Sequence, residues 1–183
     1  MVDPDTAVAD TLRWLGRAVV GLNLCPFAKA VLVKRQVHIA VGTAEDASGL
    51  LAEFARELDD LLALDARVRD TTLLVLPQGM ADFHSFNDLA GRAERMVRKR
   101  RLEGVVQVAH FHPRFVFAGT DEDDITNATN RAPHPILHLL REESMDRAVA
   151  AFPDAAAIYE TNMETLRALG PEGWDALGVG ASE

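Results

Sequence analysis

Four of the six histidines lie between residues 110 and 138, where their spacing suits acid–base chemistry. His110 and His112 are two positions apart in an extended stretch, so their rings point to the same face of a strand. Imidazole titrates near neutral pH, which makes it the usual general acid or base. Glu142 lies one helical turn beyond His138 if that stretch is a helix. We predict His112 and His138 as catalytic residues, with Glu142 orienting His138.

The residues before His138 include groups that suit an anion. Arg131 carries a planar guanidinium whose paired donors match carboxylate or phosphate. Asn127 and Asn130 add neutral donors, so we predict that these three residues bind a small anionic ligand. The alternative is that Asn130 and Arg131 bond loop carbonyls and fix a long connection between elements.

Cys25, the one cysteine of the chain, is a further catalytic candidate. A thiolate nucleophile needs a histidine and a group that orients it, and His112 or His138 with Asn130 are the right types. The expected topology argues against this arrangement, because Cys25 leads into the first strand and His112 follows the third. The alternative is a small buried hydrophobe in a loop that Pro26 stiffens.

The same histidines raise the question of a metal site. If a divalent ion is bound, His110, His112 and His138 are the nitrogen ligands we expect. Pro135 interrupts the spacing of a helical zinc motif, and the acidic run 121–124 lacks the glycine and terminal glutamate of a calcium loop. We predict no cofactor and keep a divalent metal as an alternative.

Strand-like and helix-like stretches alternate along the chain and must position these groups. Apolar or alternating stretches predict strands over 37–41, 71–76 and 105–111, with a fourth strand or hairpin arm at Phe115–Phe117. Their spacing of roughly 30 residues is typical of strand–helix–strand units with parallel neighbours. We therefore predict an α/β fold whose small, mostly parallel sheet of three to four strands is sandwiched by helices. An α+β ferredoxin-like arrangement is the alternative.

Apolar residues recur every three to four positions in the stretches between these strands. They predict helices over 3–21, from a cap at Thr43 to 62, over 83–97, from about Pro135, and over 154–169. Residues 1–169 are expected to form a single domain. The last segment, 170–183, is rich in glycine, and we expect a flexible or loosely packed tail.

Composition excludes several classes of protein. The chain has 183 residues, of which 48% are hydrophobic, enough for one ordinary globular core. Lys and Arg number 19 against 28 Asp and Glu, and the net charge of −9 disfavours nucleic acid as a partner. The segment Met1–Asp10 lacks the features of a signal peptide, and no apolar run approaches the roughly 18 residues of a membrane helix. We expect a cytoplasmic protein with no membrane partner, and predict no oligomeric state.

Three stretches of the chain carry a recognisable pattern. They are 21–28 (GLNLCPFA), 111–119 with its FHP and FAG elements, and 127–142, which contains TNRAPHPILHLLRE. The chain resembles a bacterial family of uncharacterised proteins, numbered fourteen-fifteen in the domain-of-unknown-function series. The resemblance extends from about Val8 to Leu169 and implies no established activity.

The resemblance bears on individual site residues. The positions that match the family's pattern are Cys25, His112, Asn130, Arg131, His138 and Glu142. The chain departs from it at Ala132, where the family has serine, and at His134, where it has tyrosine. A small polar residue is common in place of His110, so the resemblance supports neither His110 nor His134 as functional.

Together, these features favour a small cytoplasmic enzyme that acts on an anionic metabolite by histidine acid–base chemistry. The hypothesis requires His112 and His138 to lie within reach of one substrate. Two alternatives from other classes stay open at this point. One is a non-catalytic metal-binding protein, and the other is a small-ligand sensor or partner-binding module.

Overall fold

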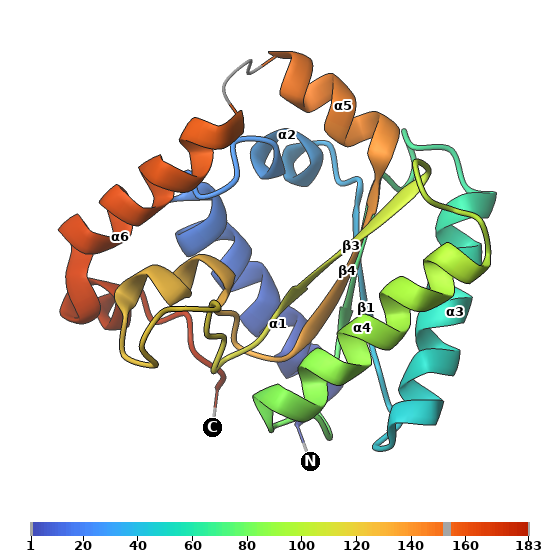
Figure 1. Ribbon diagram of the computed structural model, residues 1–183, viewed down its shortest axis with the longest axis horizontal. Helices are drawn as coiled ribbons and strands as arrows, with labels where there is room; N and C mark the ends of the chain where they lie inside the picture. The colour runs from blue at the N-terminus through green and yellow to red at the C-terminus, as the bar shows by residue number, and fades with distance from the viewer. Residues whose placement is uncertain (1, 152–154, 183) are drawn as a thin grey trace.

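Four extended segments pair into one sheet in the order β1-β2-β4-β3, with helices on both faces (Figure 1). The computed structural model describes residues 2–151 and 155–182. The strands are β1 (Val37–Val41), β2 (Thr71–Val75), β3 (Val106–Phe111) and β4 (Ile136–Arg141). The helices are α1 (Pro4–Trp14), the π-helical η1 (Leu15–Val20), α2 (Ala28–Val33), α3 (Ala47–Ala63), α4 (Phe83–Lys99), the 3₁₀ helix η2 (Ile125–Asn130), α5 (Glu142–Ala151) and α6 (Ala155–Ala176).

The α/β class and the three strands expected from the pattern are confirmed. β1 and β2 are parallel, whereas β4 lies antiparallel between β2 and β3. β1, β2 and β3 therefore run in one direction, as their spacing predicts, yet two of the three pairings are antiparallel. This pairing differs from the mostly parallel sheet that we expected. Helices on both faces exclude the ferredoxin-like alternative, in which they cover one face.

The inserted strand β4 occupies the stretch expected to be helical from about Pro135. That prediction is wrong because β4 is central and buried on both faces. Leu137 and Leu139 pack with α3 and α4, whereas Ile136 packs with α1 on the other face. A strand buried on both sides is a continuous apolar run, which cannot be told from a buried helix by periodicity. The strand expected at Phe115–Phe117 is absent from the described residues, and helix begins only at Glu142.

Aspartates cap the N-termini of three of the α-helices. The carboxylates of Asp3, Asp46 and Asp82 accept hydrogen bonds from backbone N–H groups in the first turns of α1, α3 and α4. Such caps satisfy donors that a helix start leaves unpaired and are worth about 1 kcal/mol each. Thr43, expected to cap the second helix, instead donates its hydroxyl to Glu53 at 2.9 Å.

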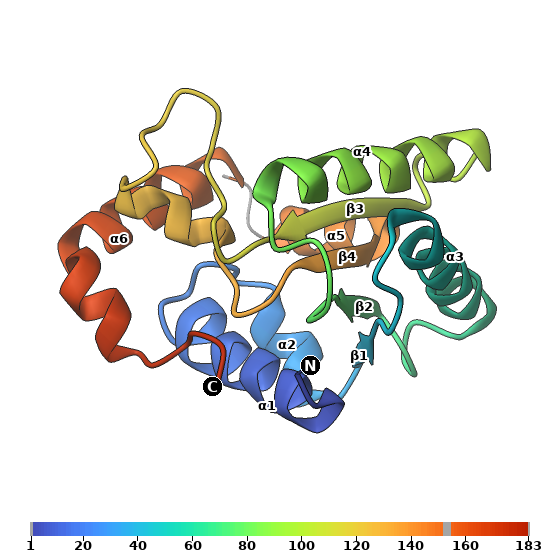
Figure 2. The same ribbon diagram turned by 90° about the horizontal axis from the view of Figure 1, so that it is seen from below.

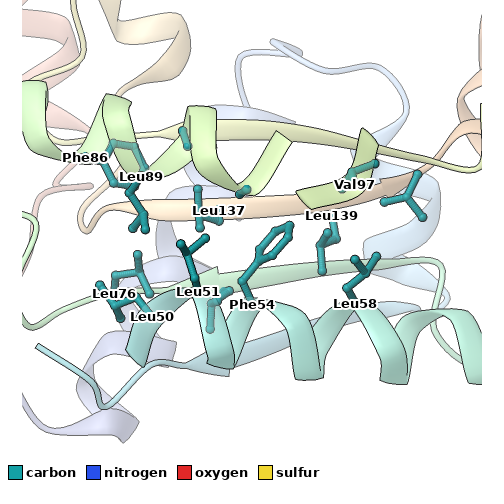
Figure 3. Close-up of a cluster of buried hydrophobic side chains, with 14 of the residues drawn as sticks. Leu50, Leu51, Phe54, Leu58, Leu76, Phe86, Leu89, Val97, Leu137 and Leu139 are labelled. Atoms are coloured by element: carbon teal, nitrogen blue, oxygen red, sulfur yellow. The ribbon is translucent and has the colours of Figure 1, made fainter. Parts of the chain in front are cut away.

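The main core fills the space between the sheet and helices α3 and α4 (Figure 3). Apolar residues recur along one face of α3, among them Leu50, Phe54 and Leu58, which are fully buried. They meet Leu137 and Leu139 of β4 across this layer. Side-chain alternation sends the neighbouring residues of β4, including His138, to the opposite face.

The opposite face of the sheet carries α1, η1 and α2 (Figure 2). Trp14 of α1 packs edge-on against Phe111 of β3, with ring centroids 5.1 Å apart. α2 differs from α1, because none of its residues is buried. The apolar layer is therefore complete under α1 and thin under α2.

The described part of the segment 170–183 continues α6 and then contacts α1. Gly170 has φ 70°, which breaks α6 into two helical pieces at a residue type that tolerates this conformation. Val179 is buried, and Arg13 donates to the carbonyl oxygens of Gly178 and Gly180 at 2.8 and 2.9 Å. Ser182 donates to Asp10 at 2.6 Å. The helix expected over 154–169 is present from residue 155, and residue 154 lies outside the described residues.

Within residues 2–151 and 155–182, no helix combines the length and apolar character needed to cross a membrane. The longest, α6, contains a proline and several charged side chains.

Candidate functional site

A cavity of about 540 Å³ lies on the α1 and α2 face of the sheet, at the end where β1 and β2 begin and β4 ends. Figure 1 shows α2 and α5 at this end of the sheet, and residues from both helices line the cavity. Most of the lining is apolar and includes Leu15, Phe27, Val31, Leu73, Leu140 and Met145. The polar lining consists of Cys25, Lys34, Gln36, Arg67, Asp70, Thr71, His138, Arg141, Ser144 and Arg147. An apolar cavity with few polar groups is the usual form of a small-molecule site.

His138 enters the cavity from the central strand β4, in register with Leu73 of β2. Its Nε2 lies 2.5 Å from the hydroxyl oxygen of Thr71, and that hydroxyl donates to the carbonyl oxygen of Leu139 at 2.7 Å. Burial lowers the pKa of His138 from 6.5 to about 4. The ring is therefore neutral at physiological pH, with one nitrogen protonated and the other an acceptor.

Cys25 lines the same cavity, in the turn that precedes α2. Burial raises the pKa of its thiol, while hydrogen bonds from the backbone N–H groups of Phe27 and Ala28 act in the opposite direction. The expected topology argued against a meeting of Cys25 with the histidines, yet Cys25 and His138 line the same cavity, whereas His112 does not line it. The chain between η1 and β1 passes over the sheet face, so Cys25 is not confined to the strand's edge.

Positive charge predominates among the ionisable groups of the cavity. Lys34, Arg67, Arg141 and Arg147 line it, against Asp70 as the one carboxylate among the described lining residues. Two of the cations have carboxylate partners outside the lining. Arg67 pairs with Asp65 at 3.0 Å, and Arg147 pairs with Glu143 at 2.6 Å.

The other two cations, Lys34 and Arg141, form no ion pair within the described part of the chain. Arg141 instead donates to backbone carbonyls, including that of Leu64 at 2.6 Å. Asp70 accepts a hydrogen bond from Ser144 at 2.5 Å. The cavity therefore offers uncompensated positive charge in a chain whose net charge is −9.

His110 and His112 share one face, as expected, but it is the face opposite His138. His110 is paired with Leu137, and its ring lies 6.0 Å from that of Phe86 on α4. His112 is 1% exposed. Its Nδ1 accepts from the backbone N–H of Arg114, and its Nε2 lies 3.0 Å from the carbonyl oxygen of Met80. Burial lowers the pKa of both rings.

The structure therefore separates His112 from His138 by the sheet, and the predicted acid–base pair does not form. The predicted role of Glu142 in orienting His138 depended on a helix between them, whereas His138 lies on β4 and Glu142 begins α5. Thr71 contacts the His138 ring instead. Within the described residues, no group of histidine, cysteine or acidic side chains has the arrangement of a metal site, and His110 and His112 face away from His138.

The predicted anion-binding residues hold the connection between β3 and β4 together. Asn127 accepts from the backbone N–H of Phe117 at 3.0 Å and donates to the carbonyl of Asp121 at 2.8 Å. Asn130 donates to the carbonyl oxygen of His110 at 3.2 Å.

Arg131 likewise donates to the carbonyls of Phe115 and Glu122, at 3.3 and 2.6 Å. Asn127, Asn130 and Arg131 thus each donate to backbone oxygens of this connection or of the strand before it. This is the loop-fixing alternative, and none of the three lines the cavity.

Several cavity residues escaped sequence reasoning. Thr71 opens an apolar strand, and Arg141 ends the stretch taken as helix, so neither stood out. Lys34, Asp70 and Ser144 are polar residues near element ends, where polar residues are common. Reading Ile136–Arg141 as a strand beside β2 would have placed Thr71 and Arg141 near the Cys25 and His138 region.

Sequence comparison agrees with the resemblance of the three motifs. The profile of one family, described as "Protein of unknown function (DUF1415)", matches residues 6–176. No curated protein and no solved structure matches the chain. The matched span includes Cys25, Thr71, His138 and every other residue that lines the cavity. With nearly the whole chain matched, this protein belongs to the DUF1415 family.

Proposed function

We propose that this protein is a small enzyme that acts on an amphipathic organic anion, with the cavity as its active site and His138 as its proton acceptor. The observation that carries the proposal is the joint lining of one cavity by His138, Cys25 and a group of cations. The apolar walls suit a hydrocarbon or aromatic body, and the cations suit a carboxylate or phosphate group. An anionic metabolite was also the ligand that the sequence favoured, but at a different set of residues.

The placement of charge supports an anion rather than a neutral ligand. Lys34, Arg67 and Arg147 are exposed, whereas His138 lies deeper, beside the apolar Leu73. A ligand with an apolar body inside and a charged group outside satisfies both regions. Charges at the mouth of a low-dielectric cleft also attract ligands of opposite sign over the distance that salt screening allows.

The chemistry of His138 follows from its surroundings. Burial lowers the pKa of His138 to about 4, so without a bound anion its ring is neutral at physiological pH. A negative charge close to an imidazole favours the protonated form and raises its pKa. Binding of an anion therefore converts His138 into a stronger proton acceptor, which couples acid–base chemistry to occupancy of the site. Cys25 contributes a neutral thiol beside the ligand, because burial raises the pKa of that group.

Octanoate and 1-octanol make a matched pair of probes, since they share an alkyl body and differ in charge. We expect calorimetric titration to show tighter binding of octanoate than of octanol. Replacing the exposed cations together (Lys34→Gln, Arg67→Gln and Arg147→Gln) is expected to weaken octanoate binding roughly tenfold and octanol binding by less than twofold. The control variant changes the net charge equally on exposed residues outside the cavity, by Arg56→Gln, Arg92→Gln and Lys99→Gln.

The two variants separate a local site from a general effect of charge. Equal losses of octanoate binding in both would show attraction by the whole molecule and contradict the proposal. The second readout is the pKa of His138, followed by NMR with and without saturating octanoate. We expect octanoate to raise this pKa and octanol to leave it unchanged, and an unchanged pKa with octanoate bound would remove His138 as the proton acceptor.

A further inference from the structure

We infer that Thr71 is a positioning residue that fixes His138 as the Nε2–H tautomer, so that the site selects organic anions bearing a hydrogen-bond donor beside Nδ1. The inference rests on the proposed function for its ligand and adds the group that this ligand must carry. The tautomer itself follows from hydrogen bonds on the protein alone.

The Thr71 hydroxyl has a single proton and two neighbours that could accept it. The hydroxyl oxygen lies 2.7 Å from the carbonyl oxygen of Leu139, which can only accept, and 2.5 Å from Nε2 of His138. A hydroxyl has one hydrogen to donate and lone pairs to accept with. If the hydrogen goes to Leu139, the contact with His138 is a hydrogen bond only when Nε2 carries a proton and donates. Both contacts are satisfied by the Nε2–H tautomer.

The fold holds this arrangement in place. Thr71 begins β2 and His138 lies in the middle of β4, and the two strands are antiparallel neighbours. Thr71 is 6% exposed, and its hydroxyl is bonded to the backbone of β4. The hydroxyl therefore cannot rotate toward His138 as a donor without breaking a buried hydrogen bond and leaving the Leu139 carbonyl without this donor.

Nδ1 of His138 is left as the acceptor that faces the cavity. Within residues 2–151 and 155–182, Nδ1 has no hydrogen-bond partner. Every fully buried side-chain nitrogen or oxygen in that part of the chain does have a partner, so Nδ1 is not fully buried. Nδ1 is therefore open to the cavity. The neighbours of the His138 ring are apolar. The centroid of the Phe111 ring lies 6.1 Å from that of His138, and Leu73 is the residue paired with His138 on β2.

A ligand that displaces solvent from Nδ1 must replace the lost hydrogen bond or leave a buried acceptor unpaired. Hydroxyl and amide N–H groups are donors of this kind, and an acidic proton would be transferred to the same lone pair. Simple alkyl carboxylates have no such group away from their charged end. The ligand class is therefore an organic anion with a donor on its body, such as a hydroxy acid.

The tautomer is tested first, by ¹⁵N NMR of the His138 ring in the ligand-free protein. We expect a protonated Nε2 and an unprotonated Nδ1 in the natural protein and in Thr71→Ser, which keeps the hydroxyl. Thr71→Val removes the hydroxyl with little change in size and is expected to give a mixture of tautomers. A protonated Nδ1 in the natural protein, or an unchanged Nε2–H tautomer in Thr71→Val, would overturn the assignment.

The ligand class is tested by titrating 2-, 3- and 8-hydroxyoctanoate against octanoate. We expect at least one hydroxy acid to bind about fivefold more tightly than octanoate, the gain of one hydrogen bond. Thr71→Ser should keep this preference, and Thr71→Val should reduce the ratio of hydroxy-acid to octanoate affinity to less than twofold. A preference that is absent from the natural protein, or unchanged in Thr71→Val, refutes the selection.

The outcomes distinguish this inference from the function on which it rests. If octanoate and all three hydroxy acids fail to bind while NMR shows the Nε2–H tautomer, the proposed ligand class is wrong and the tautomer assignment survives. If octanoate binds and the hydroxy acids bind no better, the proposed function survives and the donor requirement is wrong.

Discussion

The properties of single residues in this protein are set by the strand positions they occupy. His138 and His112 have the same side chain and are both buried in part or in full, yet they differ in what surrounds them. Both nitrogens of His112 are engaged by backbone groups, of Met80 before α4 and of Arg114 after β3, and its ring is buried. His138 has one nitrogen held by Thr71 and one that opens into a cavity. Only the second arrangement can exchange a proton with a ligand.

The depressed pKa of His138 predicts a dependence of stability on pH. Its pKa is about 4 in the folded protein, against about 6.5 for an exposed histidine. Between these values the unfolded chain binds the proton more readily, so the free energy of unfolding decreases as the pH falls from about 6.5 to 4. We expect a loss of up to about 3 kcal/mol from this group. Urea titrations of His138→Gln should lack this part of the loss.

The control for this titration is His84→Gln, which removes an exposed histidine on α4. It should keep the pH dependence of the natural protein. Burial also lowers the pKa of His110 and His112, so these groups contribute equally in all three proteins. The same slope in His138→Gln and the natural protein would show that folding does not lower the pKa of His138.

Cys25 gives a second prediction at this scale. Because burial raises its pKa above 9.0, the thiol is protonated at neutral pH and reacts slowly. At pH 7 we expect its alkylation by iodoacetamide to be at least about tenfold slower than that of a free thiol such as glutathione. The rate should rise with pH and fall when octanoate fills the cavity. Alkylation as fast as that of glutathione would contradict the buried thiol.

At the level of elements, the insertion of β4 between β2 and β3 decides where the site lies. β1, β3 and helices α1, α3 and α4 were predictable, because local periodicity distinguishes their faces. β2 was predictable as a short apolar run that ends before Pro77. β4 was not, because Ile136–Arg141 is apolar on both sides and its identity depends on the neighbours with which it pairs. The partners of an inserted strand are a property of the tertiary fold.

The same distinction explains how much of the candidate site could be predicted. Residue types and motifs singled out Cys25 and His138, and both line the cavity. Their common location was not predictable, because it depends on a loop that passes over the sheet and on the strand character of β4. Arg131 and Asn127 have chemistry suited to ligands, but the backbone carbonyls of their own loop engage it. Sequence gives the donors of a side chain and not their acceptors.

The long connection between β3 and β4 should therefore matter for stability and not for binding. Asn127 is fully buried and joins the backbone at Phe117 and Asp121. We expect Asn127→Ala to lower the free energy of unfolding by about 2 kcal/mol, because buried backbone partners lose their hydrogen bonds. Octanoate affinity of the folded variant should stay within twofold of the natural value. A larger loss of octanoate affinity in a fully folded Asn127→Ala variant would indicate that the ligand binds at this connection.

For the whole molecule, the two ends of the chain are joined through a buried carboxylate. Asp10 of α1 is fully buried and accepts hydrogen bonds from Arg13, His134 and Ser182. His134 precedes β4, and Ser182 lies near the end of the chain, so one side chain connects the first helix, the segment before β4 and the last segment. Figure 2 shows the C-terminal end of the chain beside α1. These hydrogen bonds lower the pKa of Asp10 although burial opposes them.

Asp10→Asn tests this connection. The variant leaves three donors facing a neutral amide, and we expect it to lower the free energy of unfolding by about 2 to 4 kcal/mol. Asp5→Asn, on an exposed position of the same helix, should change stability by less than about 0.5 kcal/mol. Equal stability of Asp10→Asn and the natural protein in urea titrations would show that the end segment does not depend on Asp10.

The cations of the cavity contrast with the net charge of −9 of the whole chain. An acidic surface repels anions in general, so a ligand anion must be attracted by local charge at the cavity, where Lys34, Arg67 and Arg147 are exposed. The most direct test is to map chemical-shift changes by NMR while octanoate is added. We expect chemical-shift changes at Cys25, Thr71 and His138 and none at His112, Asn130 or Arg131. Changes confined to the connection between β3 and β4, or no saturable change at the cavity, would contradict this expectation.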